Sequence, residues 1–94
     1  MYFRKGNYTA ALDYYQKALV IRKKTLPENH PDIALSYGNI GVVYFRKGEY
    51  RNAYNYLKKA YEIFRSKHGD KHPMTQQALN TLKFVEQKLK ESGQ

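Results

Sequence analysis

The chain has 94 residues, the size of one small domain, and its 41% apolar content, with ten Tyr and four Phe, predicts a folded protein. The absence of Cys excludes disulfides, thiolate metal sites and Cys nucleophiles, and no apolar run approaches the roughly 20 residues that span a bilayer, so we expect a soluble cytoplasmic protein. The formal net charge of +9 favours acidic or polyanionic partners.

The first predicted helix covers residues 8–25 and lies within an internal repeat. The string YFRKGNY at residues 2–8 returns as YFRKGEY at residues 44–50, and further identities follow at the same offset of 42 residues. Self-similarity at such a period indicates stacked supersecondary units. Because Met1 aligns with Val43, the helix that should precede residues 8–25 is reduced to its last turn. The apolar face left without that partner contains Ala11, Tyr14, Tyr15, Ala18 and Ile21. We therefore expect a longer array, or self-association through this face.

The second predicted helix covers residues 32–47. The apolar residues that recur on one face at spacings of three and four are Ile33, Tyr37, Ile40, Gly41 and Tyr44. Pro31 suits the first helical turn, and Asp32 there faces the positive end of the helix dipole. Gly48, like Gly6 in the preceding unit, is suited to the positive φ that often ends a helix. The pattern predicts a helix followed by a tight turn.

The third predicted helix, residues 50–66, forms an antiparallel hairpin with the second. Its apolar positions are Ala53, Tyr56, Leu57, Ala60, Ile63 and Phe64. Gly41 and Ala53 are small where the two helices should approach most closely, since larger side chains would hold the backbones apart.

The fourth predicted helix covers residues 73–91 and loses the repeat pattern. Lys83 and Glu86 occupy positions that carry Gly and Tyr in the second helix. A solvated outer face of this kind is typical of a terminal capping helix. The elements together predict an all-α fold, an α-solenoid of antiparallel helix pairs, in a single domain over residues 1–94. It should contain about two units of 42 residues, with a truncated first helix and a C-terminal capping helix.

The central unit carries a recognisable motif. It reads Tyr37-x2-Ile40-Gly41-x2-Tyr44, then Ala53-x3-Leu57, Ala60 and Pro73. This resembles the tetratricopeptide repeat, W-x2-L-G-x2-Y followed by A-x3-F and P, whose usual period is about 34 residues. Here Tyr replaces Trp and Leu replaces Phe, and the longer unit with its His-Pro pair is similar to the repeats of kinesin light chains. The resemblance implies a non-enzymatic scaffold or adaptor that binds protein partners.

The resemblance also implies where a ligand would bind, because the first helix of each pair forms the concave wall. An Asn at the position of Asn39 commonly holds the ligand backbone in peptide-binding members, although the pattern is equally compatible with an Asn39 that faces water. The last helix exposes Gln77, Asn80, Thr81, Phe84 and Lys88 in the same register. The candidate peptide-binding residues are Arg4, Leu35, Asn39, Val42, Arg46, Asn80, Phe84 and Lys88. Basic groups around an apolar surface favour an acidic peptide with an apolar anchor, and kinesin light chains take acidic cargo motifs.

Other functions have weaker support in the sequence. Many Lys and Arg interleaved with Tyr also favour single-stranded nucleic acid, although most Tyr residues fall on helix-packing positions. A purely structural repeat fragment is a third reading. The sequence contains neither a Gly-rich phosphate loop nor a nucleophile paired with a base, so we do not predict an enzyme. His30 and His72 occupy equivalent positions in the repeat, which the loop explains. A metal site that included His68 and His72 would have no convincing third ligand, so we expect neither a metal nor a cofactor.

Overall fold

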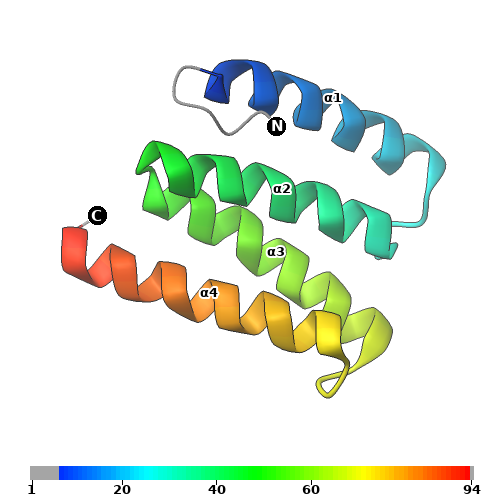
Figure 1. Ribbon diagram of the computed structural model, residues 1–94. Coiled ribbons are helices and arrows are strands. Elements are labelled where there is room, and N and C mark those ends of the chain that lie inside the picture. The colour runs from blue at the N-terminus through cyan, green and yellow to red at the C-terminus, as the bar shows by residue number, and fades with distance from the viewer. Residues whose placement is uncertain (1–6, 94) are drawn as a thin grey trace.

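The computed structural model describes residues 7–93, which form α1 (Tyr8–Thr25), α2 (Pro31–Lys47), α3 (Tyr50–His68) and α4 (Pro73–Ser92). Consecutive helices are antiparallel, so α2 and α4 run in one direction with α3 between them in the other (Figure 1). No strand occurs in the described part of the chain, which confirms the predicted all-α fold. Arg4 and Gly6 lie outside the described residues.

The two helices that begin with His-Pro share one capping geometry. The Nδ1 atom of His30 accepts a hydrogen bond of 3.0 Å from the backbone N–H of Asp32, and Nδ1 of His72 accepts one of 3.1 Å from Met74. Proline follows each His in the first helical turn, where its missing N–H costs no hydrogen bond. The repeated His-Pro pair therefore starts α2 and α4: the sequence analysis placed Pro31 in the first helical turn but did not predict the capping role of His30 and His72.

Glycines with positive φ end three of the helices. Gly48, at φ +84°, closes α2, and its N–H donates to the carbonyl of Phe45 over 3.0 Å, as its sequence position predicted. Helix α3 continues past residue 66 to His68 and stops at Gly69, which has φ +89°. Helix α4 stops at Gly93 with φ +76°. None of the helices in residues 7–93 is long and apolar enough to cross a membrane.

The core lies along α3, where α2 and α4 pack on it. One buried cluster contains Ala53, Leu57, Leu82 and Val85, and a second contains Ala34, Ala60 and Phe64. Gly41 marks the closest approach of α2 to α3, because a Cβ atom there would lie 2.7 Å from Cγ of Leu57 and 3.2 Å from the carbonyl oxygen of Ala53. The structure thus confirms the expected role of small residues in this hairpin.

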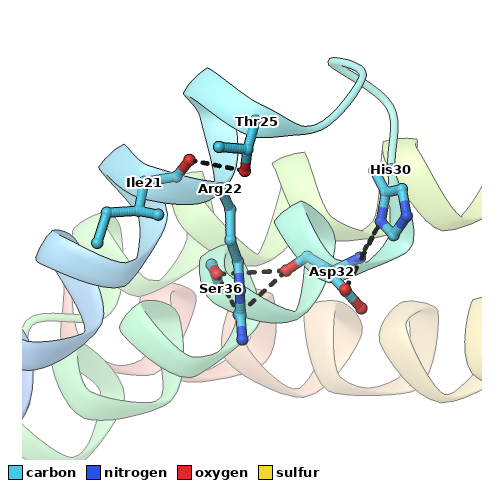
Figure 2. A network of polar contacts seen from close by, with 6 residues as sticks. All are labelled: Ile21, Arg22, Thr25, His30, Asp32 and Ser36. Carbon is cyan, nitrogen blue, oxygen red and sulfur yellow. Dashed lines mark hydrogen bonds and ion pairs between the residues drawn. The ribbon is translucent and has the colours of Figure 1, made fainter.

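Helix α1 packs on α2 through a polar contact as well as through apolar side chains. The guanidinium of Arg22 donates a 2.7 Å hydrogen bond to Oγ of Ser36 and a longer one, 3.4 Å, to the carbonyl of Asp32 (Figure 2). Ser36 is 1% exposed, and its hydroxyl also donates to the Asp32 carbonyl over 3.2 Å. Arg22 therefore fixes the C-terminal half of α1 against the first turns of α2.

The face of α1 that we expected to be apolar and unpaired is narrower than predicted. Ala11 is fully buried, whereas Ile21 is 62% exposed and its neighbour Val20 is 53% exposed. Placing Ala11 on the open face was wrong, since its small side chain lies on the packed side of the helix. Ile63, the repeat counterpart of Ile21, packs against the cluster around Phe64.

Candidate functional site

A groove lies between α2 and α4 with α3 as its floor, and we call it the α2/α4 groove. Its α2 wall consists of Ala34, Leu35, Gly38, Asn39 and Val42. Its floor and α4 wall consist of Leu57, Ala60, Phe64, Met74, Gln77, Ala78 and Thr81. The volume is about 170 Å³, left open because several of these residues are Ala or Gly. None of the lining residues carries a charge, so the groove suits an apolar side chain.

The structure brings some of the candidate residues together in this groove. Leu35, Asn39 and Val42 line it from α2. On α4 the wall is formed by Gln77 and Thr81, which the 42-residue offset relates to Leu35 and Asn39. The repeat alignment is therefore the sequence signal that identifies Gln77 and Thr81 as groove residues. Asn80 instead is exposed and does not line the groove, whereas its neighbour Thr81 does.

Two side-chain amides in the groove are available to a ligand. Within residues 7–93 neither Asn39 nor Gln77 forms a side-chain hydrogen bond, and Asn39 is half-buried. The hydroxyl of Thr81 donates to the backbone carbonyl of Gln77 over 3.0 Å. An amide both donates and accepts, as the backbone of an extended peptide requires of its partner. The groove thus offers an apolar floor and two amides with unused hydrogen-bonding capacity.

An aromatic cluster lies beyond the groove, toward the C-terminal ends of α2 and α4, and we call Phe45, Tyr50 and Phe84 the aromatic shelf. The ring centroids of Phe45 and Phe84 are 5.5 Å apart, and those of Phe45 and Tyr50 are 5.2 Å apart. Phe84 is 53% exposed, and Nζ of Lys88 lies 5.6 Å from its ring centroid. Of the candidate residues, Phe84 therefore belongs to the shelf and Lys88 lies over it. Arg46 is exposed on the last turn of α2.

A larger cleft, of about 540 Å³, lies between the α1–α2 connection and α3. It is lined by Glu28, Asn29, Tyr37, Lys59, Glu62, Ile63 and Ser66. Lys59 already contacts the ring of Tyr37, with Nζ 5.8 Å from the centroid. The charged and polar groups here are largely exposed, and no nucleophile is paired with a base. We place the candidate site in the smaller α2/α4 groove because the amides of Asn39 and Gln77, which form no side-chain hydrogen bond within residues 7–93, lie there beside an uncharged floor.

The tyrosines near this cleft pack on one another. The Tyr56 ring stacks on Tyr44 at 5.6 Å with an interplanar angle of 13°, and its centroid is 6.2 Å from that of Tyr37. Burial raises the pKa of Tyr56 above its ordinary value, and the neighbouring hydroxyls of Tyr44 and Tyr37 raise it further. Rings engaged in this way are not open platforms for bases, which weakens the nucleic-acid alternative.

The histidines are occupied in packing and capping. The rings of His68 and His72 stack with centroids 4.2 Å apart, and Nδ1 of His72 is held by the N-terminal turn of α4. Among residues 7–93 no group of three or more His, Cys, Asp and Glu side chains is arranged to hold a metal ion.

Comparison with known proteins agrees with this architecture. The family model for the tetratricopeptide repeat matches residues 1–66 and again residues 32–93, and the two matches overlap over 32–66, the α2–α3 hairpin. No curated protein matches the chain. The matched ranges together cover residues 1–93, nearly the whole sequence. The chain belongs to the tetratricopeptide repeat family.

Proposed function

We propose that the α2/α4 groove binds an extended peptide segment of a protein partner. Tetratricopeptide repeats generally mediate protein–protein interactions. The observation that carries the proposal is the unused hydrogen-bonding capacity of Asn39 and Gln77 beside an uncharged cavity of about 170 Å³. An extended peptide presents a backbone N–H and C=O that one amide can satisfy together, while an apolar side chain enters the cavity.

We further propose that the peptide is acidic. The chain has a formal net charge of +9, and Lys88 lies beside the exposed ring of Phe84 next to the groove. Arg46 adds an exposed cation at the end of α2. Such a field raises the rate at which an acidic partner encounters the site and disfavours basic competitors. The similarity of the 42-residue unit to kinesin light chain repeats supports the same ligand class.

The direct test is to remove the amide of Asn39. We expect Asn39→Ala to weaken binding of acidic peptides by roughly two- to tenfold, the value of one hydrogen bond of about 0.5–1.5 kcal/mol. Peptides with one aliphatic or aromatic residue would be titrated by isothermal calorimetry, with circular dichroism to verify that the variant folds. Asn80→Ala is the matched control, because Asn80 is an exposed Asn on α4 outside the groove.

Two results would contradict the proposal. One is an unchanged affinity for Asn39→Ala, or an equal loss for Asn80→Ala, since either would exclude a specific role for the groove amide. The other is the absence of peptide binding together with tight binding of single-stranded oligonucleotides that weakens steeply as salt increases. That pattern would assign the basic surface to nucleic acid.

A further inference from the structure

The α2/α4 groove and the aromatic shelf differ in chemistry and lie one after the other along the same two helices. Because α2 and α4 run in the same direction, their N-terminal halves lie at one end of the molecule and their C-terminal ends at the other (Figure 1). The uncharged cavity reaches from Met74 to Thr81 along α4. The shelf and its cation, Phe84 and Lys88, follow nearer the C-terminal end. A bound peptide would therefore meet an apolar cavity and a cationic aromatic surface in succession.

The separation between cavity and cations follows from helix geometry. Ala78 lies on the cavity wall, and at about 1.5 Å of rise per residue Phe84 and Lys88 lie roughly 9 and 15 Å further along α4. Lys88 leans back over the Phe84 ring, with Nζ 5.6 Å from the centroid, so its charge lies between those two heights. On α2, Arg46 follows Gly38 by about 12 Å on the same measure. Both helices thus carry a basic residue about 12 Å along the helix axis from Gly38 and Ala78, the residues at the middle of the cavity.

An extended peptide matches this separation at one spacing. A strand advances about 3.3 Å per residue, so four residues cover roughly 13 Å. Side chains four positions apart point to the same face of a strand, whereas those three or five apart point to opposite faces. A spacing of two keeps the same face but reaches only about 7 Å, which falls short of the cations.

We propose, on the basis of the peptide-binding function above, that the groove selects a motif in which an aliphatic residue and an acidic residue are four positions apart. The aliphatic side chain occupies the cavity between Gly38 and Ala78. The acidic side chain lies with its methylene groups on the ring of Phe84 and its carboxylate at the ammonium group of Lys88.

The contact of Lys88 with Glu91 gives this motif an internal competitor. Nζ of Lys88 is 3.8 Å from Oε1 of Glu91, within the same helix. A peptide carboxylate must share Lys88 with that residue. Removing the charge of Glu91 should therefore strengthen the contact between Lys88 and the acidic residue of the peptide. A purely apolar role for the shelf would not predict this gain.

The experiment is a spacing series measured by NMR titration of the whole chain. Each peptide has one Leu and one Glu separated by two, three, four, five or six positions, in both orders, on a Ser and Ala background. We expect the tightest binding at a spacing of four in one of the two orders, by at least about threefold over a spacing of three. A peptide with Gln in place of Glu measures binding through the cavity alone.

Three variants assign the effect to the shelf. Lys88→Gln should abolish the higher affinity at a spacing of four, but should not change the affinity for the control peptide in which Gln replaces Glu. Glu91→Gln should increase the affinity difference between spacings of four and three. Lys90→Gln is the matched control, because Lys90 is an exposed cation on α4 that takes no part in the shelf. High salt should reduce the advantage, since the contact is electrostatic and partly exposed.

The outcomes separate this inference from the function on which it rests. Peptides that bind, lose affinity in Asn39→Ala and show no dependence on spacing would overturn the four-residue motif and leave peptide binding intact. An equal loss at every spacing in Lys88→Gln would also overturn it, because the charge would then act only at long range. No binding by any peptide in the series would contradict both proposals.

Discussion

The 42-residue repeat makes the contact of α1 with α2 equivalent to the contact of α3 with α4. At equivalent positions the first contact is polar and the second is apolar. Arg22 on α1 corresponds to Phe64 on α3, and Ser36 on α2 corresponds to Ala78 on α4. The first pair forms a 2.7 Å hydrogen bond (Figure 2), and the second is an apolar contact in which Phe64 is 5% exposed.

The difference shows which part of the repeat the fold requires. Ala11 and its counterpart Ala53 are both fully buried, so a small buried residue recurs at this position of both units. The longer side chains at the edge of each contact are free to be polar or apolar, provided that their partners match. An exchange of only one partner would leave a buried polar group or a cavity.

Truncation of the two corresponding side chains should give the largest contrast. Phe64→Ala should lower the free energy of unfolding by about 3–5 kcal/mol, because it removes a buried aromatic ring. Arg22→Ala should cost about 1 kcal/mol, since Ser36 keeps its own hydrogen bond to the Asp32 carbonyl. Urea denaturation followed by circular dichroism measures both values.

Phe64→Leu provides a second variant if Phe64→Ala does not fold. It preserves most of the apolar volume and should cost about 1 kcal/mol. Losses of equal size for Arg22→Ala and Phe64→Ala would show that the two contacts do not differ as the structure indicates.

The contrast between α2 and α4 can be tested at another related pair, Gly41 and Lys83. Gly41→Ala should destabilise the protein, because overpacking against Leu57 costs about 1–3 kcal/mol and outweighs the gain of about 1 kcal/mol in helix propensity. Lys83→Ala should change stability by less than about 0.5 kcal/mol, since Lys83 is exposed. Thermal melting of both variants gives the comparison.

Gly38→Ala is the control for helix propensity. A Cβ atom at Gly38 would meet nothing within 4 Å, so this variant should gain about 0.5–1 kcal/mol. If Gly41→Ala were as stable as Gly38→Ala, the close approach of α2 to α3 would be refuted.

A third pair of corresponding residues, Ile33 and Thr75, differs in polarity inside the core. Both are 1% exposed, but Oγ1 of Thr75 is buried without a hydrogen-bond partner in residues 7–93. Thr75→Val should raise the free energy of unfolding by about 1 kcal/mol, because it removes an unsatisfied polar atom at nearly constant volume. Calorimetric melting tests this, and a lower melting temperature would mean that the hydroxyl is satisfied in solution.

The sequence predicted the helices and their pairing because those signals are local and repeated. Gly48 ends α2 with φ +84° and Gly41 permits close packing, and both effects follow from the absence of a side chain. The Arg22–Ser36 hydrogen bond was not predicted, since it joins residues 14 apart and has no counterpart in the second unit. His30 was missed as a cap because Ser, Thr, Asp and Asn are the residues that usually fill that position.

The sequence analysis identified some of the residues that line the α2/α4 groove. Leu35, Asn39 and Val42 share one face of α2, which helical periodicity alone identifies. Asn80 lies outside the groove because burial of Leu82 and Val85 against α3, a tertiary constraint, sets the rotation of α4. The offset of 42 residues from Asn39 already pointed to Thr81 instead.

The central claim, that the α2/α4 groove is the ligand site, is tested most directly by mapping amide chemical shifts during titration with an acidic peptide that contains Leu. The account predicts the largest changes at Gly38, Asn39 and Thr81, which line the groove. Changes centred on Glu28 and Glu62, in the larger cleft between the α1–α2 connection and α3, would contradict it.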